Sequence, residues 1–233
     1  MRDRSSRKRL RPAAARHYPG DGLFERIARA VCAAGAVPRK ELHESWEIAR
    51  RARRRLRGAR VVDLACGHGL VAHVAAILNP EAREVLAVDR RVPGSAEPLA
   101  ASMAASWPFL AERVRVEQRP LEDVPLRAVD VVLSAHACGR LTDVVLERAV
   151  AAGCAVAVLP CCSVHARQDT GSLEGWLAPD LAIDVVRALR LRAAGYDVWT
   201  QTIPGDITPK NRLLIARPAA GQPPRASAQA ASP

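Results

Sequence analysis

Small and acidic residues meet in one short segment of the chain. Residues 61–70 read V-V-D-L-A-C-G-H-G-L, so Asp63 ends an apolar run, and Gly67 and Gly69 lie in a turn before a helical pattern. A turn of small residues lets backbone N–H groups approach a ligand closely at the start of a helix. The third glycine of the dinucleotide pattern G-x-G-x-x-G is missing, because residue 72 is alanine. The acidic start favours a ligand with an ammonium group over a diphosphate.

Acidic residues also follow two later apolar runs. Asp89 lies 26 residues after Asp63, at the end of a run where a carboxylate can accept hydrogen bonds from ribose hydroxyls. Glu122 and Asp123 follow the next run, where an acidic side chain can meet an adenine amino group, and Glu122 is the candidate. An ammonium, a ribose and an adenine together describe S-adenosylmethionine, which we predict as the cofactor. Its methionine part would lie on the turn that is formed by Asp63, Cys66, Gly67 and Gly69.

A fourth apolar run ends in S-A-H-A-C-G, residues 134–139. Its His136 is the candidate catalytic residue, for proton removal or substrate positioning, because an imidazole exchanges protons near neutral pH. Ser134 is a further candidate cofactor-binding residue. The alternative is that His136 and Cys138 pack in this turn for structural reasons.

Short valine-rich runs without polar alternation predict strands that are covered on both faces, and the helical segments between them predict crossover connections. The sequence therefore predicts a Rossmann-like, doubly wound sheet of seven mostly parallel strands, in which the candidate residues share the edge formed by the strand carboxyl ends. Pro204 and Gly205 between the last two runs predict an antiparallel last strand. The expected strands are 61–64, 84–88, 114–118, 129–134, 155–159, 197–203 and 212–216. The expected helices are 70–78, 94–107, 142–152 and 181–194.

The chain ends differ from this α/β pattern. Residues 1–20 lack apolar periodicity and predict a flexible basic arm, and residues 21–58 predict a helical basic extension. The α/β domain is expected over residues 59–217. Residues 218–233 are rich in Ala, Pro, Gln and Ser, which predicts a disordered tail.

The positive charge of the chain is concentrated near its N-terminus. The 233 residues carry a formal net charge of +11, of which residues 1–60 hold +12 and the remainder −1. Such a segment favours an anionic partner, and we predict that it binds RNA phosphates. The alternative is a solvated face in an arginine-rich composition that reflects coding bias, since only Lys8, Lys40 and Lys210 are lysines.

The cysteines and the hydropathy pattern indicate the compartment. Six cysteines occur without a C-x-x-C pair, and no secretory or membrane-spanning segment is evident. We therefore expect a cytoplasmic protein with reduced thiols and no membrane association. No metal is expected, although a zinc site remains an alternative for the thiols and imidazoles of Cys138, Cys161, Cys162, His136 and His165.

Residues 40–217 resemble the class I S-adenosylmethionine-dependent methyltransferases. The segment D-L-A-C-G-H-G resembles their first motif, with Ala65 in place of the usual first glycine. The segments H-A-C-G-R-L-T-D, P-C-C and P-K-N-R-L-L are similar to a subfamily that has bacterial members and includes a eukaryotic tRNA ribose 2′-O-methyltransferase.

This resemblance implies a methyltransferase, and we expect RNA (tRNA or rRNA) as its substrate. Three alternatives remain open: a protein or small-molecule methyltransferase, a non-catalytic RNA-binding protein with this fold, and a nucleotide-dependent oxidoreductase.

Overall fold

A computed structural model describes residues 3–135, 137–160 and 168–220. Its centre is a seven-stranded sheet in the order β3-β2-β1-β4-β5-β7-β6. β7 is antiparallel to both of its neighbours, whereas β1 to β5 pair in parallel. This is the predicted fold class, including the antiparallel last strand. The strands are β1 (Arg60–Leu64), β2 (Glu84–Asp89), β3 (Val114–Gln118), β4 (Asp130–Ser134), β5 (Ala155–Val158), β6 (Tyr196–Thr202) and β7 (Arg212–Pro218).

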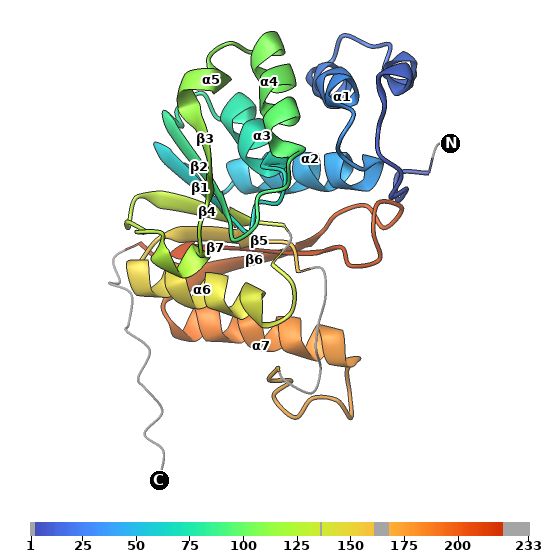
Figure 1. Cartoon of the computed structure of the whole chain (residues 1–233). Helices are drawn as coiled ribbons and strands as arrows, with labels where there is room; N and C mark the ends of the chain where they lie inside the picture. The colour runs from blue at the N-terminus through green and yellow to red at the C-terminus, as the bar shows by residue number, and fades with distance from the viewer. Residues whose placement is uncertain (1–2, 136, 161–167, 221–233) are drawn as a thin grey trace.

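Helices cover both faces of the sheet, with α1 to α5 on one face and α6 and α7 on the other (Figure 1). The α-helices are α1 (Leu23–Ala34), α2 (Arg39–Arg53), α3 (Leu70–Leu78), α4 (Ala96–Ser106), α5 (Leu110–Arg113), α6 (Arg140–Ala152) and α7 (Pro179–Ala193). Two short 3₁₀ helices, η1 (Pro12–His17) and η2 (Leu121–Asp123), lie in the connections. Both of these, and α5, escaped the sequence-based prediction because each is too short to show a period.

Each central strand contributes to two separate cores, because successive side chains of a strand point to opposite faces. Val61 and Leu133 pack under the helices of the α1–α5 layer. Val62 and Val132 pack instead with apolar residues of α6 and α7. The valine-rich runs lack polar alternation because neither face of these strands meets water.

The N-terminal segment differs from the free arm expected from the sequence. Leu10 is only 2% exposed, and its N–H donates to the Val37 carbonyl at 2.9 Å. Arg9 forms an antiparallel bridge with Pro38, and Tyr18 packs edge-on against Phe24. Leu10 and Tyr18 are apolar anchors within an arginine-rich stretch, and burying them holds the segment against the helices.

The helical extension belongs to the same core as the sheet. Ile27 of α1 and Leu42 and Ile48 of α2 are fully buried in the cluster that also contains Val61 and Leu70. Residues on both sides of the boundary expected at residue 58 therefore share one hydrophobic core. At the other end, β7 extends to Pro218, and residues 221–233 of the expected tail lie outside the described residues. No helix in the described ranges is long and apolar enough to cross a membrane.

Candidate active site

The turn after β1 has the backbone conformation that its small residues allow. Gly67 and Gly69 have φ angles of +54° and +77°, and Ala65 has a φ of +57°. The Cys66 N–H donates to the Val88 carbonyl at 3.0 Å, and the Gly69 N–H donates to the Cys66 carbonyl at 2.9 Å. Left-handed backbone suits glycine, whereas an alanine there is strained. The turn therefore holds strain at Ala65, where this sequence lacks the first glycine that the resemblance expects.

Asp89 closes this turn from the end of β2. Its Oδ2 accepts a hydrogen bond from the Gly67 N–H, and its Oδ1 accepts one from the Arg91 N–H, both at 2.9 Å. A carboxylate has about four acceptor positions, so both oxygens can also accept from ribose hydroxyls. A Cβ built on Gly67 would meet no atom within 4 Å, so open space lies beside the turn.

Asp63 lies buried under the same turn. Its side chain is almost without solvent exposure, and its Oδ2 accepts from the Ala72 N–H at 3.2 Å. Its Oδ1 is buried without a hydrogen-bond partner among the described residues. Burial raises the pKa of Asp63 to about 8, and the nearby Asp89 charge raises it further. A buried acceptor without a donor fits the ammonium group that the acidic start of the motif predicts.

A group of three side chains beside the turn was missed by sequence reasoning. His68 Nδ1 lies 2.6 Å from the Ser95 hydroxyl, and His68 Nε2 lies 3.7 Å from Glu41 Oε2 at the start of α2. Burial lowers the pKa of His68, and the Arg9 charge lowers it further. His68 is visible in the motif, but its partners lie on other helices far along the chain, so no spacing pattern reveals them.

The other predicted cofactor residues have mainly internal contacts. Cys66 is buried, and burial raises the pKa of its thiol, which disfavours the reactive thiolate. The Ser134 hydroxyl is buried and donates to the Leu64 carbonyl at 2.6 Å, which links β4 to β1. Their backbone positions border the predicted site, and cofactor contact by either residue stays a prediction.

Glu122 is not joined to this group. Glu122 lies in η2, where its carbonyl accepts from Arg148 of α6 and its side chain lines a shallow cavity of about 410 Å³ beside that helix. Contact of Glu122 with an adenine stays a prediction. His136 lies outside the described residues, and so do Cys161, Cys162 and His165 of the zinc alternative. Within the described ranges no three His, Cys, Asp or Glu side chains are grouped to hold a metal ion.

A second cavity, of about 620 Å³, lies away from the turn. It is bounded by α7, β6 and β7, and its lining includes Leu181, Leu189 and Thr200. The polar segment before β7 is occupied with structural contacts, since Lys210 pairs with Asp180 and the Asn211 side chain donates to the Ile203 carbonyl at 3.0 Å. The candidate active site is therefore the turn after β1 together with Asp63 and Asp89.

Comparison with known proteins gives one family match. A family model described as a methyltransferase domain matches residues 40–169, which include Asp63, the glycine turn and Asp89. A comparison with curated protein sequences finds no match. The family match supports S-adenosylmethionine as the cofactor that these residues would hold.

Solved structures with a similar fold extend over most of the chain. An O-methyltransferase family protein from Burkholderia thailandensis is 18% identical, with a TM-score of 0.53 over 91% of this chain and 64% of its own. The S-adenosylmethionine-dependent methyltransferase SibL is 24% identical, with a TM-score of 0.50 over 91% and 66%. The mitomycin 7-O-methyltransferase MmcR is 18% identical, with a TM-score of 0.50 over 89% and 60%. This chain spans just under two thirds of their length, and the likeness is one of fold.

Proposed function

We propose that this chain, which belongs to the methyltransferase-domain family, transfers methyl groups from S-adenosylmethionine to RNA. The bound cofactor would supply an electrophilic methyl group on a positively charged sulfur. Methyl transfer depends mainly on aligning the acceptor atom with that methyl group, so proximity and orientation are expected to supply most of the catalysis.

The residues of the candidate active site have distinct proposed roles. Gly67 leaves space for the methionine part of the cofactor, Gly69 allows the left-handed backbone at the end of the turn, and the free Oδ1 of Asp63 would accept from the ammonium group. Asp89 would accept from the ribose hydroxyls while it holds the Gly67 N–H. We keep His136 as the proposed group for proton removal or substrate positioning.

The observation that carries the choice of RNA is the cationic segment beside this site. Arg7, Lys8 and Arg9 are exposed, and the bridge from Arg9 to Pro38 fixes their backbone. Arg9 lies close enough to His68 for its charge to act on the pKa of that imidazole. A row of cations at the border of the turn can bind phosphates of a substrate whose acceptor atom enters the site.

A second group of cations lies at the other end of α2. Arg50 and Arg51 pair with Glu47, and Arg55 stacks over Trp199, so these three arginines already have partners. Arg53 and Arg54 are exposed and have no ion pair within the described residues. The two ends of α2 are about 21 Å apart at 1.5 Å per residue, so each end would contact different phosphates.

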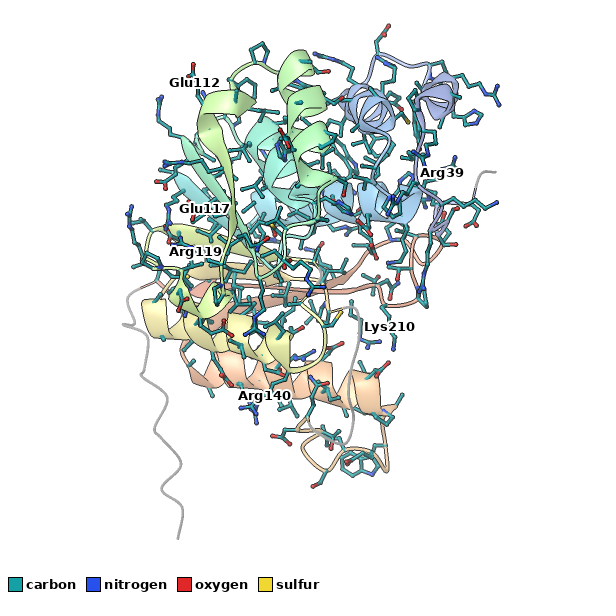
Figure 2. All side chains as sticks on the ribbon, in the orientation of Figure 1. Arg39, Glu112, Glu117, Arg119, Arg140 and Lys210 are labelled. Carbon is teal, nitrogen blue, oxygen red and sulfur yellow. The ribbon has the colours of Figure 1, made fainter. Side chains whose placement is uncertain are left out.

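Cationic residues also flank the first group. Figure 2 shows Arg39, at the start of α2, on the same side of the molecule as Lys210 in the loop between β6 and β7. Arg4 of the N-terminal segment pairs with Asp206 of that loop, so the segment and the loop are in contact. This side of the molecule is therefore the proposed RNA-binding surface, with Arg7, Lys8 and Arg9 at its centre.

The proposal is tested by incubating the purified protein with S-adenosylmethionine that is labelled on its methyl group and with separated RNA, protein and metabolite fractions. We expect label in RNA, and less label when Arg7, Lys8 and Arg9 are all changed to Gln. The matched control changes three exposed arginines outside residues 1–60, Arg83, Arg115 and Arg127, and should leave labelling unchanged.

Three outcomes would count against RNA methylation. Label in the protein fraction or in the metabolite fraction alone would identify another class of substrate. RNA binding without transfer to any fraction would identify a non-catalytic RNA-binding protein. Equal loss of labelling in both triple variants would show that total charge, and not the surface beside the turn, is responsible.

A further inference from the structure

Arg187 of α7 lies buried beneath the turn that follows β4. Its side chain is 2% exposed, and its Nε and Nη2 donate to the two oxygens of Asp143 at 2.6 and 3.1 Å. The same Nη2 donates to the Gly139 carbonyl at 3.2 Å. One guanidinium is therefore hydrogen-bonded both to a carboxylate at the start of α6 and to a backbone carbonyl of the turn.

This guanidinium belongs to a chain of charges across three elements. Its Nη1 donates to Oδ1 of Asp184 at 3.0 Å, and Oδ2 of Asp184 accepts from Nε of Arg212 in β7 at 2.6 Å. A buried charge is costly unless it is paired and hydrogen-bonded, and here two carboxylates pair with two guanidiniums. Arg187 therefore pairs with Asp184 of its own helix, which in turn pairs with Arg212 of β7, while it also contacts the turn after β4.

The turn after β4 is fixed by its glycine and by hydrogen bonds from two helices. Gly139 has φ +58° and ψ −131°, a backbone region that side chains other than glycine avoid. The Thr142 hydroxyl donates to the Ala137 carbonyl at 2.5 Å, so the turn is also held from its own helix. Because β4 pairs in parallel with β1, the turn lies at the same sheet edge as Asp63 and the glycine turn.

Stability of the ion network alone does not account for the contact with Gly139. Asp143 and Asp184 already satisfy the charge of Arg187, and the additional bond to the Gly139 carbonyl acts on the position of the turn. A displacement of about 1 Å at a reacting centre can cost about 100-fold in rate. The position of this turn therefore affects the rate of transfer to any acceptor atom that binds beside it.

We infer that Arg187 is a positioning residue for methyl transfer, which fixes the turn after β4 through Gly139 and Asp143. It acts through the turn and touches neither the cofactor nor the substrate. The inference rests on the proposed methyltransferase function and adds a role that lies outside the sequence motifs, on a helix more than forty residues beyond the turn.

The test compares Arg187→Lys and Arg187→Met with the control Arg190→Met. Arg190 lies on the same helix, and its ion pair with Asp169 is exposed. Lysine keeps the charge and loses the fork geometry. For each variant the melting temperature, the affinity for S-adenosylmethionine, kcat, KM for RNA and amide hydrogen exchange over residues 137–142 are measured.

For Arg187→Lys we expect a folded protein with nearly unchanged cofactor affinity and KM. We expect its kcat to fall by about tenfold to 100-fold and amide exchange over residues 137–142 to rise. Asp143→Asn, which weakens the ion pair between Arg187 and residue 143, should change kcat and amide exchange in the same direction. This variant keeps the test available if Arg187→Met fails to fold. Arg190→Met should behave as the wild type does.

Unchanged kcat in a folded Arg187→Lys variant would overturn the inference. So would a fall in kcat that Arg190→Met shares, or one that occurs without a rise in exchange over residues 137–142. A wild-type protein that transfers no methyl group would contradict the proposed function itself. An active wild type with an equally active Arg187→Lys variant would contradict only the role of Arg187.

Discussion

The carboxylate of Asp89 accepts a hydrogen bond from the backbone N–H of Gly67 at 2.9 Å. This bond joins the end of β2 to the turn after β1, so a residue proposed to hold the ribose also fixes the turn proposed to hold the methionine part. The two halves of the candidate cofactor site are therefore mechanically linked. Loss of Asp89 should disturb both.

Asp89→Ala should remove most of the rise in melting temperature that S-adenosylmethionine produces. A hydrogen bond to a charged group contributes about 1.5–3 kcal/mol, so we expect at least a tenfold loss of affinity. Asp89→Asn keeps an acceptor for the Gly67 N–H and should lose less. Glu112→Ala, at an exposed acidic residue of α5, serves as the control. Equal cofactor-induced shifts in all variants would refute the role of Asp89.

The contribution of Asp63 to the stability of the protein without cofactor should fall between about pH 4 and pH 8. Burial raises the pKa of Asp63 from 3.8 to about 8, so in this range the folded state binds a proton that the unfolded state has lost. The free energy of unfolding then decreases with rising pH, by up to about 1.4 kcal/mol per unit from this one group. Urea denaturation of the wild type and of Asp63→Asn at several pH values measures this change in the free energy of unfolding.

Asp63→Asn has no proton to lose and should become more stable relative to the wild type as the pH rises through this range. The same variant should bind S-adenosylmethionine weakly, because an amide lacks the charge that the ammonium group needs. Parallel stability curves for the two proteins would mean that Asp63 is not a titrating buried acid.

Ala65→Gly should stabilise the protein. Alanine at a φ of +57° carries a strain of about 1–2 kcal/mol, and glycine loses about 0.5–1 kcal/mol in unfolded-state entropy. The expected net gain is about 1 kcal/mol, measured by chemical denaturation. Ala101→Gly on the exposed side of α4 has no strain to relieve and should be destabilising by a similar amount. Equal losses in both variants would contradict strain at Ala65.

RNA binding should depend on salt through the N-terminal cations. Each phosphate contact adds about −0.7 to the slope of log K against log salt for single-stranded nucleic acid. Changing Arg7, Lys8 and Arg9 to Gln should therefore reduce the magnitude of the slope by about 2, as measured by fluorescence anisotropy. The Arg83, Arg115 and Arg127 control should keep the wild-type slope. An unchanged slope in the N-terminal variant would place RNA binding elsewhere.

Much of the fold could be predicted because its signals are local. Strands buried on both faces are continuous apolar runs, and the helix Leu70–Leu78 was predicted with its observed bounds. The N-terminal segment could not be predicted in this way. Leu10 and Tyr18 are single apolar residues among arginines, and only their tertiary packing reveals that they are buried.

The part of the candidate site that lies at strand ends could also be predicted from local patterns. Asp63, Gly67, Gly69 and Asp89 share a strand-end pattern that the topology brings together. The partners of His68 and the contacts of Arg187 connect elements that are distant in the sequence, so they follow from tertiary structure alone. Ser134 shows the limit of such patterns. It lies at the strand end where a cofactor contact is expected, but its hydroxyl donates to the Leu64 carbonyl of the neighbouring strand β1.

Calorimetric titration of the folded protein with S-adenosylmethionine at pH 7 tests the central claim most directly. We predict saturable binding at one site, with proton release that makes the observed heat depend on the buffer, because Asp63 ionises beside the bound ammonium. Both the binding and the buffer dependence should be lost or strongly weakened in Asp63→Asn. Absence of binding by the folded wild-type protein, or binding that Asp63→Asn and Asp89→Ala leave unchanged, would contradict the claim.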